Sequence, residues 1–270
     1  MRLQYEFHSQ APSKEVLLLI HGMGSSSTVW KPFLNRDGSQ KLLSAFSVLS
    51  MDLPGHGKTV LDSGQEMDPV SLANSVVGTL DFLNISRFHV VANSLGGWIA
   101  LEIAAMKPER VASVIGLAPA GLWLKPFMVR QSGTAIGRIL ASSLKYFSPL
   151  LLRFKWARKI GFSRVSPKWH ELSLETCLEA ANAMANAKGY YPAWDAFLKK
   201  RFDKEIPLSV PLTIIFGDSD KTLPAENCQE RSLLPGHAKW LIFEQCGHAT
   251  MWDIPDQIIE EIFVISNSRT

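Results

Sequence analysis

The feature of this sequence that most constrains its fold is the segment around Ser94. A run of apolar and β-branched residues at 88–91 leads directly to Ser94, and a helix-like run at 98–106 follows. This pattern predicts a strand, a sharp turn with a hydroxyl group at its apex, and a helix. Such a turn is tight, so the residues two before and two after the serine must be small. Gly96 meets this requirement, whereas Ala92 carries one methyl group where glycine is usual.

Two further segments supply candidate partners for Ser94. An unactivated serine is a poor nucleophile, and a serine at the start of a helix is commonly only an N-cap. Asp220 follows the strand-like run 212–216, and His248 follows the strand-like run 240–243. The chain order is therefore Ser, Asp, His, and each residue comes soon after a predicted strand. Because the carboxyl ends of parallel strands meet at one edge of a sheet, we expect the three side chains to lie together.

Short apolar runs alternate with helical patterns along most of the chain. The candidate strands are residues 3–7, 16–20, 46–51, 88–92, 112–117, 212–216 and 239–243. The candidate helices are residues 70–83, 95–106, 225–234 and 254–264. Continuous apolar strands are typical of a sheet covered on both faces. The alternation therefore predicts the α/β class, with a mainly parallel twisted sheet flanked by helices and right-handed crossovers.

Five short motifs strengthen this prediction. In chain order they are His-Gly-Met-Gly at 21–24, Asp-Leu-Pro-Gly-His-Gly at 52–57, Asn-Ser-Leu-Gly-Gly at 93–97, Gly-Asp-Ser-Asp at 217–220 and Gly-His at 247–248. With these motifs the chain resembles the α/β-hydrolase superfamily, in its cap-bearing, esterase-like branch of serine hydrolases. The resemblance covers nearly the whole chain. It implies a core domain made of residues 1–120 and 207–270, with a helical cap inserted at residues 121–206.

The resemblance also implies roles for individual residues. They are the nucleophile Ser94, the acid Asp220, the base His248, and two backbone N–H donors of an oxyanion hole, Met23 and Leu95. Asp218 is the alternative acid, because it stands two residues before Asp220. His21 and His56 are interpreted as structural residues of their turns. The sequence contains no phosphate-binding glycine-rich loop and no His/Cys ligand cluster, so we expect no cofactor and no metal.

The identity of the nucleophile narrows the chemistry. Haloalkane dehalogenases and soluble epoxide hydrolases of this fold use Asp at the place of Ser94, so neither is favoured. The Asn93-Ser94 pair resembles carbon–carbon bond hydrolases that act on ring-fission products. In those enzymes Trp typically follows the catalytic His, whereas Ala249 follows His248 here, as in many carboxylesterases. We therefore expect hydrolysis of a carboxylic ester of a small to medium apolar acid, through an acyl-enzyme.

Three other activities stay open at this point. The first is carbon–carbon bond hydrolysis of a ring-fission product, and the second is cofactor-free haloperoxidase chemistry, which uses the same three residues. The third belongs to another class, a receptor-type protein of this fold that binds a ligand with little turnover. Steady turnover of a substrate would distinguish an enzyme from such a binding protein.

The region at residues 121–206 has an unusual composition. It contains 15 Lys and Arg against 6 Asp and Glu, a net charge of +9, whereas the whole chain carries +3. Basic and large apolar residues alternate most densely at 145–159. A solvated helix face is the leading interpretation, and a carboxylate-bearing substrate, an acidic carrier protein or an anionic membrane surface are the alternatives. No nucleic-acid-binding module is recognisable. We expect most large aromatic residues of this region to form its own core, and a few to face a substrate cavity.

The sequence also suggests a location. No apolar run approaches the roughly 20 residues that span a bilayer, and the first residues show no apolar signal segment. Stable membrane insertion is therefore not expected. The three cysteines, Cys177, Cys228 and Cys246, are odd in number and widely spaced, which favours reduced thiols. Together these features predict a cytoplasmic protein that acts on a small molecule.

Overall fold

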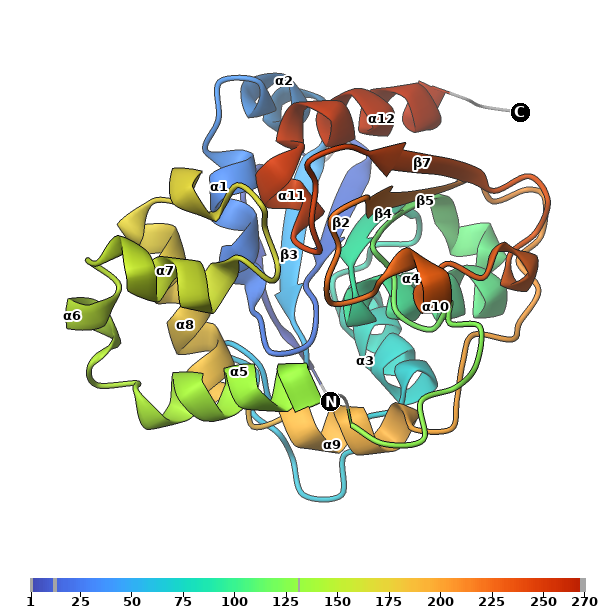
Figure 1. The fold of residues 1–270 in the computed structure, drawn as a ribbon. Coiled ribbons are helices and arrows are strands. Elements are labelled where there is room, and N and C mark those ends of the chain that lie inside the picture. The colour runs from blue at the N-terminus through green and yellow to red at the C-terminus, as the bar shows by residue number, and fades with distance from the viewer. Residues whose placement is uncertain (1, 12–13, 131, 268–270) are drawn as a thin grey trace.

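A parallel sheet forms the centre of the molecule in the computed structural model, which describes residues 2–11, 14–130 and 132–267 (Figure 1). Within those residues the sheet has seven strands in the order β1-β3-β2-β4-β5-β6-β7. The strands are β1 (Gln4–Phe7), β2 (Val16–Ile20), β3 (Ser47–Asp52), β4 (Phe88–Asn93), β5 (Val111–Leu117), β6 (Leu212–Gly217) and β7 (Lys239–Phe243). β1 pairs with β3 in antiparallel orientation, and every other pairing is parallel. The predicted α/β class is confirmed.

Helices cover both faces of this sheet, which explains why its strands are apolar throughout. In β2, Leu18 and Ile20 pack into one buried cluster, whereas Leu17 and Leu19 pack into the other. Successive side chains of a strand point to opposite faces, so each cluster lies under a separate layer of helices. The first layer holds α3 (Pro69–Phe82) and α4 (Leu95–Met106); the second holds α1 (Lys31–Leu34), α2 (Ser39–Ala45), α11 (Thr250–Asp253) and α12 (Pro255–Asn267).

Five helices lie between β5 and β6 in the described part of the chain, and Figure 1 shows α5 to α8 beside the sheet rather than over its faces. They are α5 (Ser132–Ser143), α6 (Ser148–Leu151), α7 (Lys155–Phe162), α8 (Leu174–Asn186) and α9 (Tyr190–Phe197). We refer to residues 121–206 as the cap segment. The division of the chain into a core domain and a cap domain stays a prediction.

The observed strands begin and end within one residue of those predicted, but one predicted helix is wrong. The helix expected over residues 225–234 is short and interrupted: α10 (Ala225–Cys228) is followed by a separate 3-10 turn at Arg231–Leu233. The cause is pairing with a distant loop, because Leu124 N–H donates to the Asn227 carbonyl and Glu230 N–H donates to the Leu122 carbonyl. No helix among the described residues is both long enough and apolar enough to pass through a membrane.

Candidate active site

The sequence-predicted site residues all emerge at the carboxyl ends of the strands. β2 and β4 are neighbours, yet the chain runs from β2 to β3 on one side before it returns to β4 on the other. Ligands of open α/β sheets bind at such a point of reversal. Ser94 follows β4 there, and the turn at residues 21–24 follows β2. Asp220 and His248 follow β6 and β7 on the same edge.

Ser94 occupies a strained turn between β4 and α4. Its backbone has φ 55° and ψ −117°, outside the regions that L-residues other than glycine usually adopt. Ser94 N–H donates to the Leu117 carbonyl (2.9 Å), and Ala120 N–H donates to the Ser94 carbonyl (2.9 Å), so the neighbouring loop holds this conformation. The Ser94 side chain makes no capping hydrogen bond to α4. The hydroxyl group therefore does not act as a helix cap and is available for chemistry.

Close packing accounts for the small residues around Ser94. A Cβ atom added to Gly96 would lie 2.6 Å from the carbonyl oxygens of Ile20 and His21, which are backbone atoms. A Cβ atom added to Gly22 would lie 2.9 Å from Ser94 Cβ. The turn after β2 is therefore in contact with the turn that carries Ser94. Ala92, the residue that departs from the usual glycine, lies fully buried within β4.

The two proposed oxyanion donors flank Ser94. Met23 belongs to the turn after β2 and lines the same cavity as Ser94, and Leu95 is the first residue of α4. Neither backbone N–H group donates a hydrogen bond to another described residue. Leu95 also lies at the positive end of the α4 dipole, which favours negative charge nearby. Both donors are therefore free to bind an oxygen that becomes negative during a reaction.

Asp220 and His248 form a buried hydrogen-bonded pair. His248 Nδ1 donates to Asp220 Oδ2 at 2.8 Å, and Asp220 Oδ1 accepts from the backbone N–H groups of Thr222 and Leu223, also at 2.8 Å. Burial alone would raise the pKa of Asp220, but His248 and these N–H groups lower it below its ordinary value. An ionised Asp220 holds the His248 ring in one orientation and leaves Nε2 as the group that can accept a proton.

The structure also distinguishes Asp220 from the alternative acid. Asp218 is exposed, and its Oδ1 accepts a hydrogen bond from Ser219 Oγ (2.8 Å). The Asp220 carboxylate, by contrast, is the one that contacts His248. The geometry therefore favours Asp220 over Asp218 as the partner of His248.

Ser94 and His248 line the same cavity, but no hydrogen bond joins their side chains among the described residues. Catalytic hydrogen bonds commonly tighten only when substrate is bound. The site therefore consists of a hydrogen-bonded Asp220–His248 pair and a separate Ser94 hydroxyl group on the wall of the same cavity.

Asn93 connects these two parts and was not recognised from the sequence as a positioning residue. Its Nδ2 donates to the Leu117 carbonyl and to the His248 carbonyl, both at 3.0 Å. The amide therefore ties the backbone of His248 to the strand that carries Ser94. Its position next to Ser94 is the only sequence signal for this role.

Asp253 holds the loop of His248 from the other side. Its Oδ2 accepts from the backbone N–H of Gly247 (2.8 Å), and its Oδ1 accepts from Ser166 Oγ (2.5 Å). Burial raises the pKa of Asp253 above its ordinary value. No sequence motif marks Asp253 or Ser166, because the contact joins residues far apart in the chain.

His21 and His56 are buried structural residues, in agreement with their interpretation from the sequence. His21 Nδ1 donates to the Gly22 carbonyl (2.7 Å), and its Nε2 accepts from Leu53 N–H (3.0 Å). His56 Nδ1 donates to the Pro54 carbonyl (2.9 Å), and burial lowers the pKa of His56 to about 3. Both rings stay neutral at ordinary pH and hold the turns around the site.

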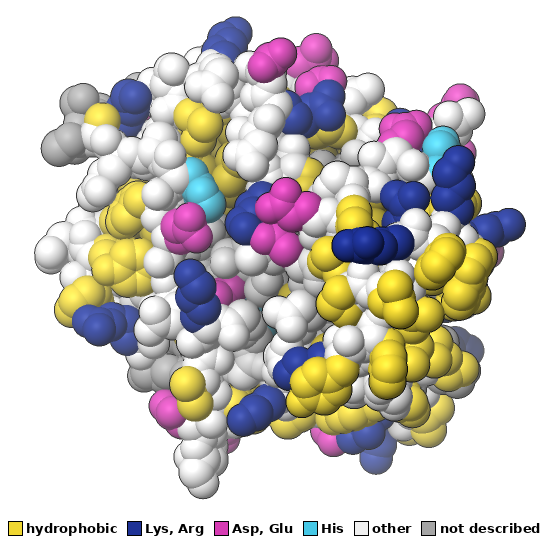
Figure 2. Space-filling view, turned by 90° about the vertical axis from the view of Figure 1, so that its left-hand side faces the viewer, with side chains coloured by type: hydrophobic (Ala, Val, Ile, Leu, Met, Phe, Trp, Pro, Cys, Tyr) yellow, Lys and Arg dark blue, Asp and Glu magenta, His cyan; other side chains and the backbone are white. Residues whose placement is uncertain are grey.

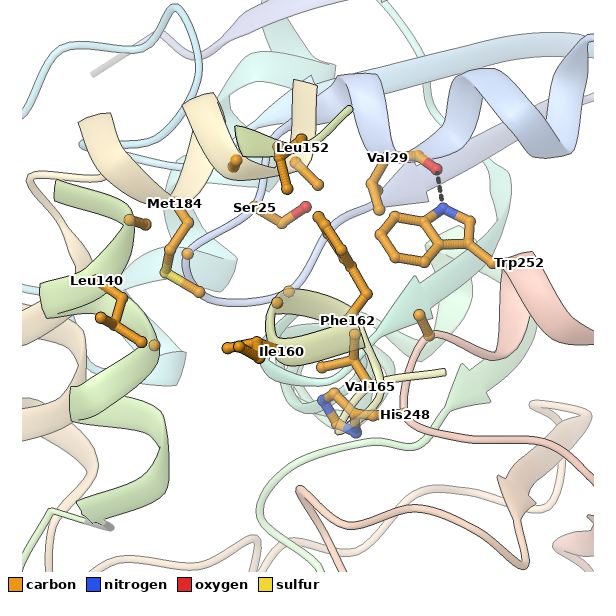
Figure 3. A pocket seen from close by; sticks show the side chains of 18 of the residues that line it. Ser25, Val29, Leu140, Leu152, Ile160, Phe162, Val165, Met184, His248 and Trp252 are labelled. Carbon is orange, nitrogen blue, oxygen red and sulfur yellow. Dashed lines mark hydrogen bonds between the residues drawn. The ribbon is translucent and has the colours of Figure 1, made fainter. Parts of the chain in front are cut away.

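A cavity of about 500 Å³ extends from Ser94 and His248 toward the cap segment (Figure 3). Apolar side chains from several elements dominate its wall, and Trp252, whose Nε1 donates to the Val29 carbonyl (3.1 Å), closes one side. The labelled cap residues on the wall are Leu140, Leu152, Ile160, Phe162, Val165 and Met184. None of the described lining residues is Lys, Arg, Asp or Glu. The cavity can therefore accept an apolar group next to Ser94.

Known proteins resemble this chain over nearly its full length. A curated 2-hydroxy-6-oxononadienedioate/2-hydroxy-6-oxononatrienedioate hydrolase 1 from Pseudomonas putida is 25% identical over 94% of this chain and 88% of its own length. A dihydrolipoyllysine-residue acetyltransferase component of the acetoin cleaving system from Pseudomonas putida is also 25% identical, over 91% of this chain. The chain spans only 62% of the length of that relative.

Solved structures share the fold. The enol-lactonase from Burkholderia xenovorans LB400 superimposes with a TM-score of 0.75 and 17% identity, covering 97% of this chain and 95% of that one. The model of the alpha/beta hydrolase family matches residues 17–261, which include β3 to β7, all of β2 except Val16, and all of the predicted site residues. The chain therefore belongs to the alpha/beta hydrolase family, and it is a hydrolase.

Proposed function

We propose that this hydrolase is a serine esterase that cleaves a carboxylic ester of a small to medium apolar acid, through an acyl-enzyme at Ser94. The observation that carries this proposal is the uncharged wall of the cavity next to Ser94 and His248. Burying a charged substrate group there would remove its hydration without a compensating partner. A cavity of about 500 Å³ has the size of a small-molecule site.

In the first half of the reaction, Ser94 Oγ attacks the ester carbonyl carbon while His248 Nε2 takes the hydroxyl proton. Asp220 stabilises the imidazolium that forms and keeps the ring oriented. The carbonyl oxygen becomes an oxyanion and accepts hydrogen bonds from the N–H groups of Met23 and Leu95, each worth about 3–4 kcal/mol in comparable sites. His248 then gives its proton to the leaving oxygen, and the alcohol departs.

In the second half, a water molecule replaces the alcohol. The water oxygen attacks the acyl carbon while His248 takes a proton from the water. The acyl carbonyl oxygen again becomes an oxyanion and accepts hydrogen bonds from the same two N–H groups. The bond to Ser94 Oγ breaks as that oxygen regains a proton from His248. The carboxylic acid is released, and the enzyme returns to its starting state.

A second candidate function is hydrolysis of a carbon–carbon bond in a ring-fission product. It is supported by the curated relative that acts on nonadienedioate compounds and by the Asn93-Ser94 pair. Such a substrate carries two carboxylates, for which the described cavity wall offers no cationic side chain. For this reason we favour the neutral ester.

Matched substrates test the proposal. We expect kcat/KM for p-nitrophenyl esters to rise about fourfold for each methylene that the cavity buries, since each contributes about 0.8 kcal/mol. The mono-p-nitrophenyl ester of adipic acid matches the hexanoate in length but ends in a carboxylate. It should react at least about tenfold more slowly, because that carboxylate loses water on entry. Ser94→Ala should remove turnover of both esters.

Three results would contradict the proposal. They are a preference for the adipate ester, faster turnover of a ring-fission dienedioate than of any ester, and unchanged activity in Ser94→Ala. Tight binding of a ligand without steady turnover would instead indicate the receptor-type function.

A further inference from the structure

Exposed hydrophobic side chains are concentrated in one part of the cap segment. Of the 19 large hydrophobic residues that are exposed in the described chain, 13 lie between Leu124 and Ile160. Figure 2 looks at the side of the molecule that carries α6 and shows apolar side chains gathered there, with Lys and Arg around them. Contiguous apolar surface of this kind marks an interaction site.

We call this surface the cap face and define it by its most exposed members, which come from α5 to α7 and the loops between them. They are Ile136, Ile139, Tyr146, Phe147, Leu150, Phe154, Trp156 and Ile160, each more than half exposed. We expected most aromatic residues of the cap segment to form a core of its own, but the buried Trp123, Tyr190, Trp194 and Phe197 pack instead into the cluster under α3 and α4. Phe162 packs into a separate cluster of cap residues. Tyr146, Phe147 and Phe154 of the cap face are exposed, and Trp156 is both exposed and part of the cavity wall.

The segment that carries the cap face is strongly basic. Residues 121–170 contain ten Lys and Arg and no Asp or Glu. Arg138 and Arg158 donate to backbone carbonyls within the cap segment. Arg153, Lys155 and Lys159 are exposed beside the apolar residues, and no ion pair among the described residues joins any of them to a carboxylate.

Helix α7 shows how the two kinds of side chain combine. Trp156 and Ile160 stand four residues apart and are 57% and 64% exposed. Lys155 and Lys159 are also four residues apart, so each pair forms one row on the helix surface. A basic row beside an aromatic and aliphatic row is the pattern of a helix that lies in the plane of a membrane interface.

The cavity opens on this same surface. Leu140, Leu144, Trp156 and Ile160 line the cavity that reaches Ser94, and all four are exposed to solvent. Residues that belong both to the cavity wall and to the outer surface mark its mouth. Trp156 and Ile160 of the cap face therefore lie at the entrance to the candidate active site.

We propose that the cap face docks on an anionic phospholipid bilayer, with the mouth of the cavity against the lipid. The aromatic side chains would lie at the boundary between headgroups and acyl chains, and Arg153, Lys155 and Lys159 would contact lipid phosphates. This is peripheral docking, which needs no membrane-spanning helix. It does not depend on the chemistry at Ser94.

The charge of the cap segment argues against a second copy of this chain as the partner that binds the cap face. A symmetric dimer through the cap face would bring Arg153, Lys155 and Lys159 of one copy close to the same three residues of the other, in a segment (residues 121–170) that contains no acidic residue. Like charges in contact oppose association. A bilayer offers both acyl chains for the apolar side chains and a continuous negative surface for the basic ones.

Vesicle co-sedimentation tests the proposal, with full-length Ser94→Ala protein so that lipid hydrolysis cannot interfere. We expect strong binding to phosphatidylcholine vesicles that contain phosphatidylglycerol, weak binding to phosphatidylcholine alone, and loss of binding as salt rises. Replacing Arg153, Lys155 and Lys159 with Gln should weaken binding on the order of 100-fold, at about fivefold per charge. Phe147→Ser with Phe154→Ser should weaken it at least about tenfold.

Matched variants on the core control for general effects of charge and hydrophobicity. Replacing Lys41, Arg87 and Lys107 with Gln removes the same charge from exposed positions outside the cap segment, and should change binding by no more than about twofold. Phe82→Ser, also at an exposed site, serves the same purpose for the apolar pair. Circular dichroism confirms folding of each variant.

Four outcomes would overturn the proposal. These are no binding to anionic vesicles, equal binding to both kinds of vesicle, equal losses in cap-face and core variants, and self-association that the cap-face substitutions abolish. Binding to an acidic protein but to neither kind of vesicle would likewise replace the bilayer with a protein partner.

Discussion

Two carboxylates in one loop illustrate how local environment assigns a role to a residue. Asp218 and Asp220 are two positions apart and chemically identical, yet only Asp220 is buried against His248. Its Oδ1 accepts two backbone N–H groups, and its Oδ2 accepts His248 Nδ1. The exposed Asp218 contacts Ser219 instead. The turn that follows β6 therefore makes Asp220 the residue that orients the imidazole ring.

This difference predicts the outcome of a matched pair of substitutions. Asp220→Asn should lower kcat by about 10⁴-fold with little change in KM, because the amide no longer holds the productive tautomer of His248. Asp218→Asn should leave kcat within about twofold, as expected for an exposed side chain. Steady-state kinetics on the best ester measures both. Equal losses in the two variants, or a larger loss for Asp218→Asn, would contradict the assignment.

The same residue gives a pH dependence of stability. The pKa of Asp220 is lower in the folded chain than in the unfolded chain, where it is about 3.9. Its ionisation therefore stabilises the fold fully above that value, and this contribution is lost as the pH falls through the lowered pKa. Urea unfolding should show that the stability gap between wild type and Asp220→Asn narrows between about pH 5 and pH 2. A constant gap would contradict the pKa shift.

At the scale of elements, the loop of His248 depends on the cap segment. Ser166 Oγ donates to Asp253 Oδ1, and Ala249 N–H donates to the Val165 carbonyl (2.9 Å). A Cβ atom added to Gly247 would lie 2.6 Å from that same carbonyl oxygen. Residues 165–166 of the cap segment are thus in direct contact with the loop that carries His248.

Ser166→Ala tests this connection. It removes a hydrogen bond to a buried carboxylate, so the free energy of unfolding should fall by about 1.5–3 kcal/mol. Because Asp253 also holds Gly247, we expect kcat to fall severalfold while KM for a small ester stays nearly constant. Ser163→Ala, in the same segment but without a contact to Asp253, is the control. The connection is refuted if both variants have the same kcat and the same stability.

Elements that form through local interactions were easier to predict from the sequence than elements that depend on contacts between residues far apart in the chain. The strand at residues 16–20 was predicted with its observed ends, because a buried parallel strand is a continuous local pattern. The helix at 225–234 was mispredicted, because hydrogen bonds from residues 122–124 interrupt it. Asp253 could not be found as a positioning residue, because its partner Ser166 is 87 residues away and neither belongs to a motif.

At the scale of the whole molecule, the cap segment differs from the rest of the chain in net charge and in exposed hydrophobic surface. The cap segment carries a net charge of +9, and the remainder carries −6. The sequence showed this asymmetry, but it could not show which cap residues face outward. Residues such as Phe147 and Phe154 read as core residues in a linear pattern, whereas the packing of α5 to α8 leaves them on the surface. The uncharged cavity likewise exists only after segments from both parts of the chain come together.

We propose that Ser94 is a nucleophile activated by His248 at the end of an apolar cavity. Labelling with a fluorophosphonate that bears an uncharged alkyl chain, followed by peptide mass spectrometry, would show whether Ser94 reacts. We expect one adduct, on Ser94 Oγ, which is absent in Ser94→Ala and forms much more slowly in Asp220→Asn. No adduct on the wild-type chain, or labelling that persists unchanged in Ser94→Ala, would contradict it.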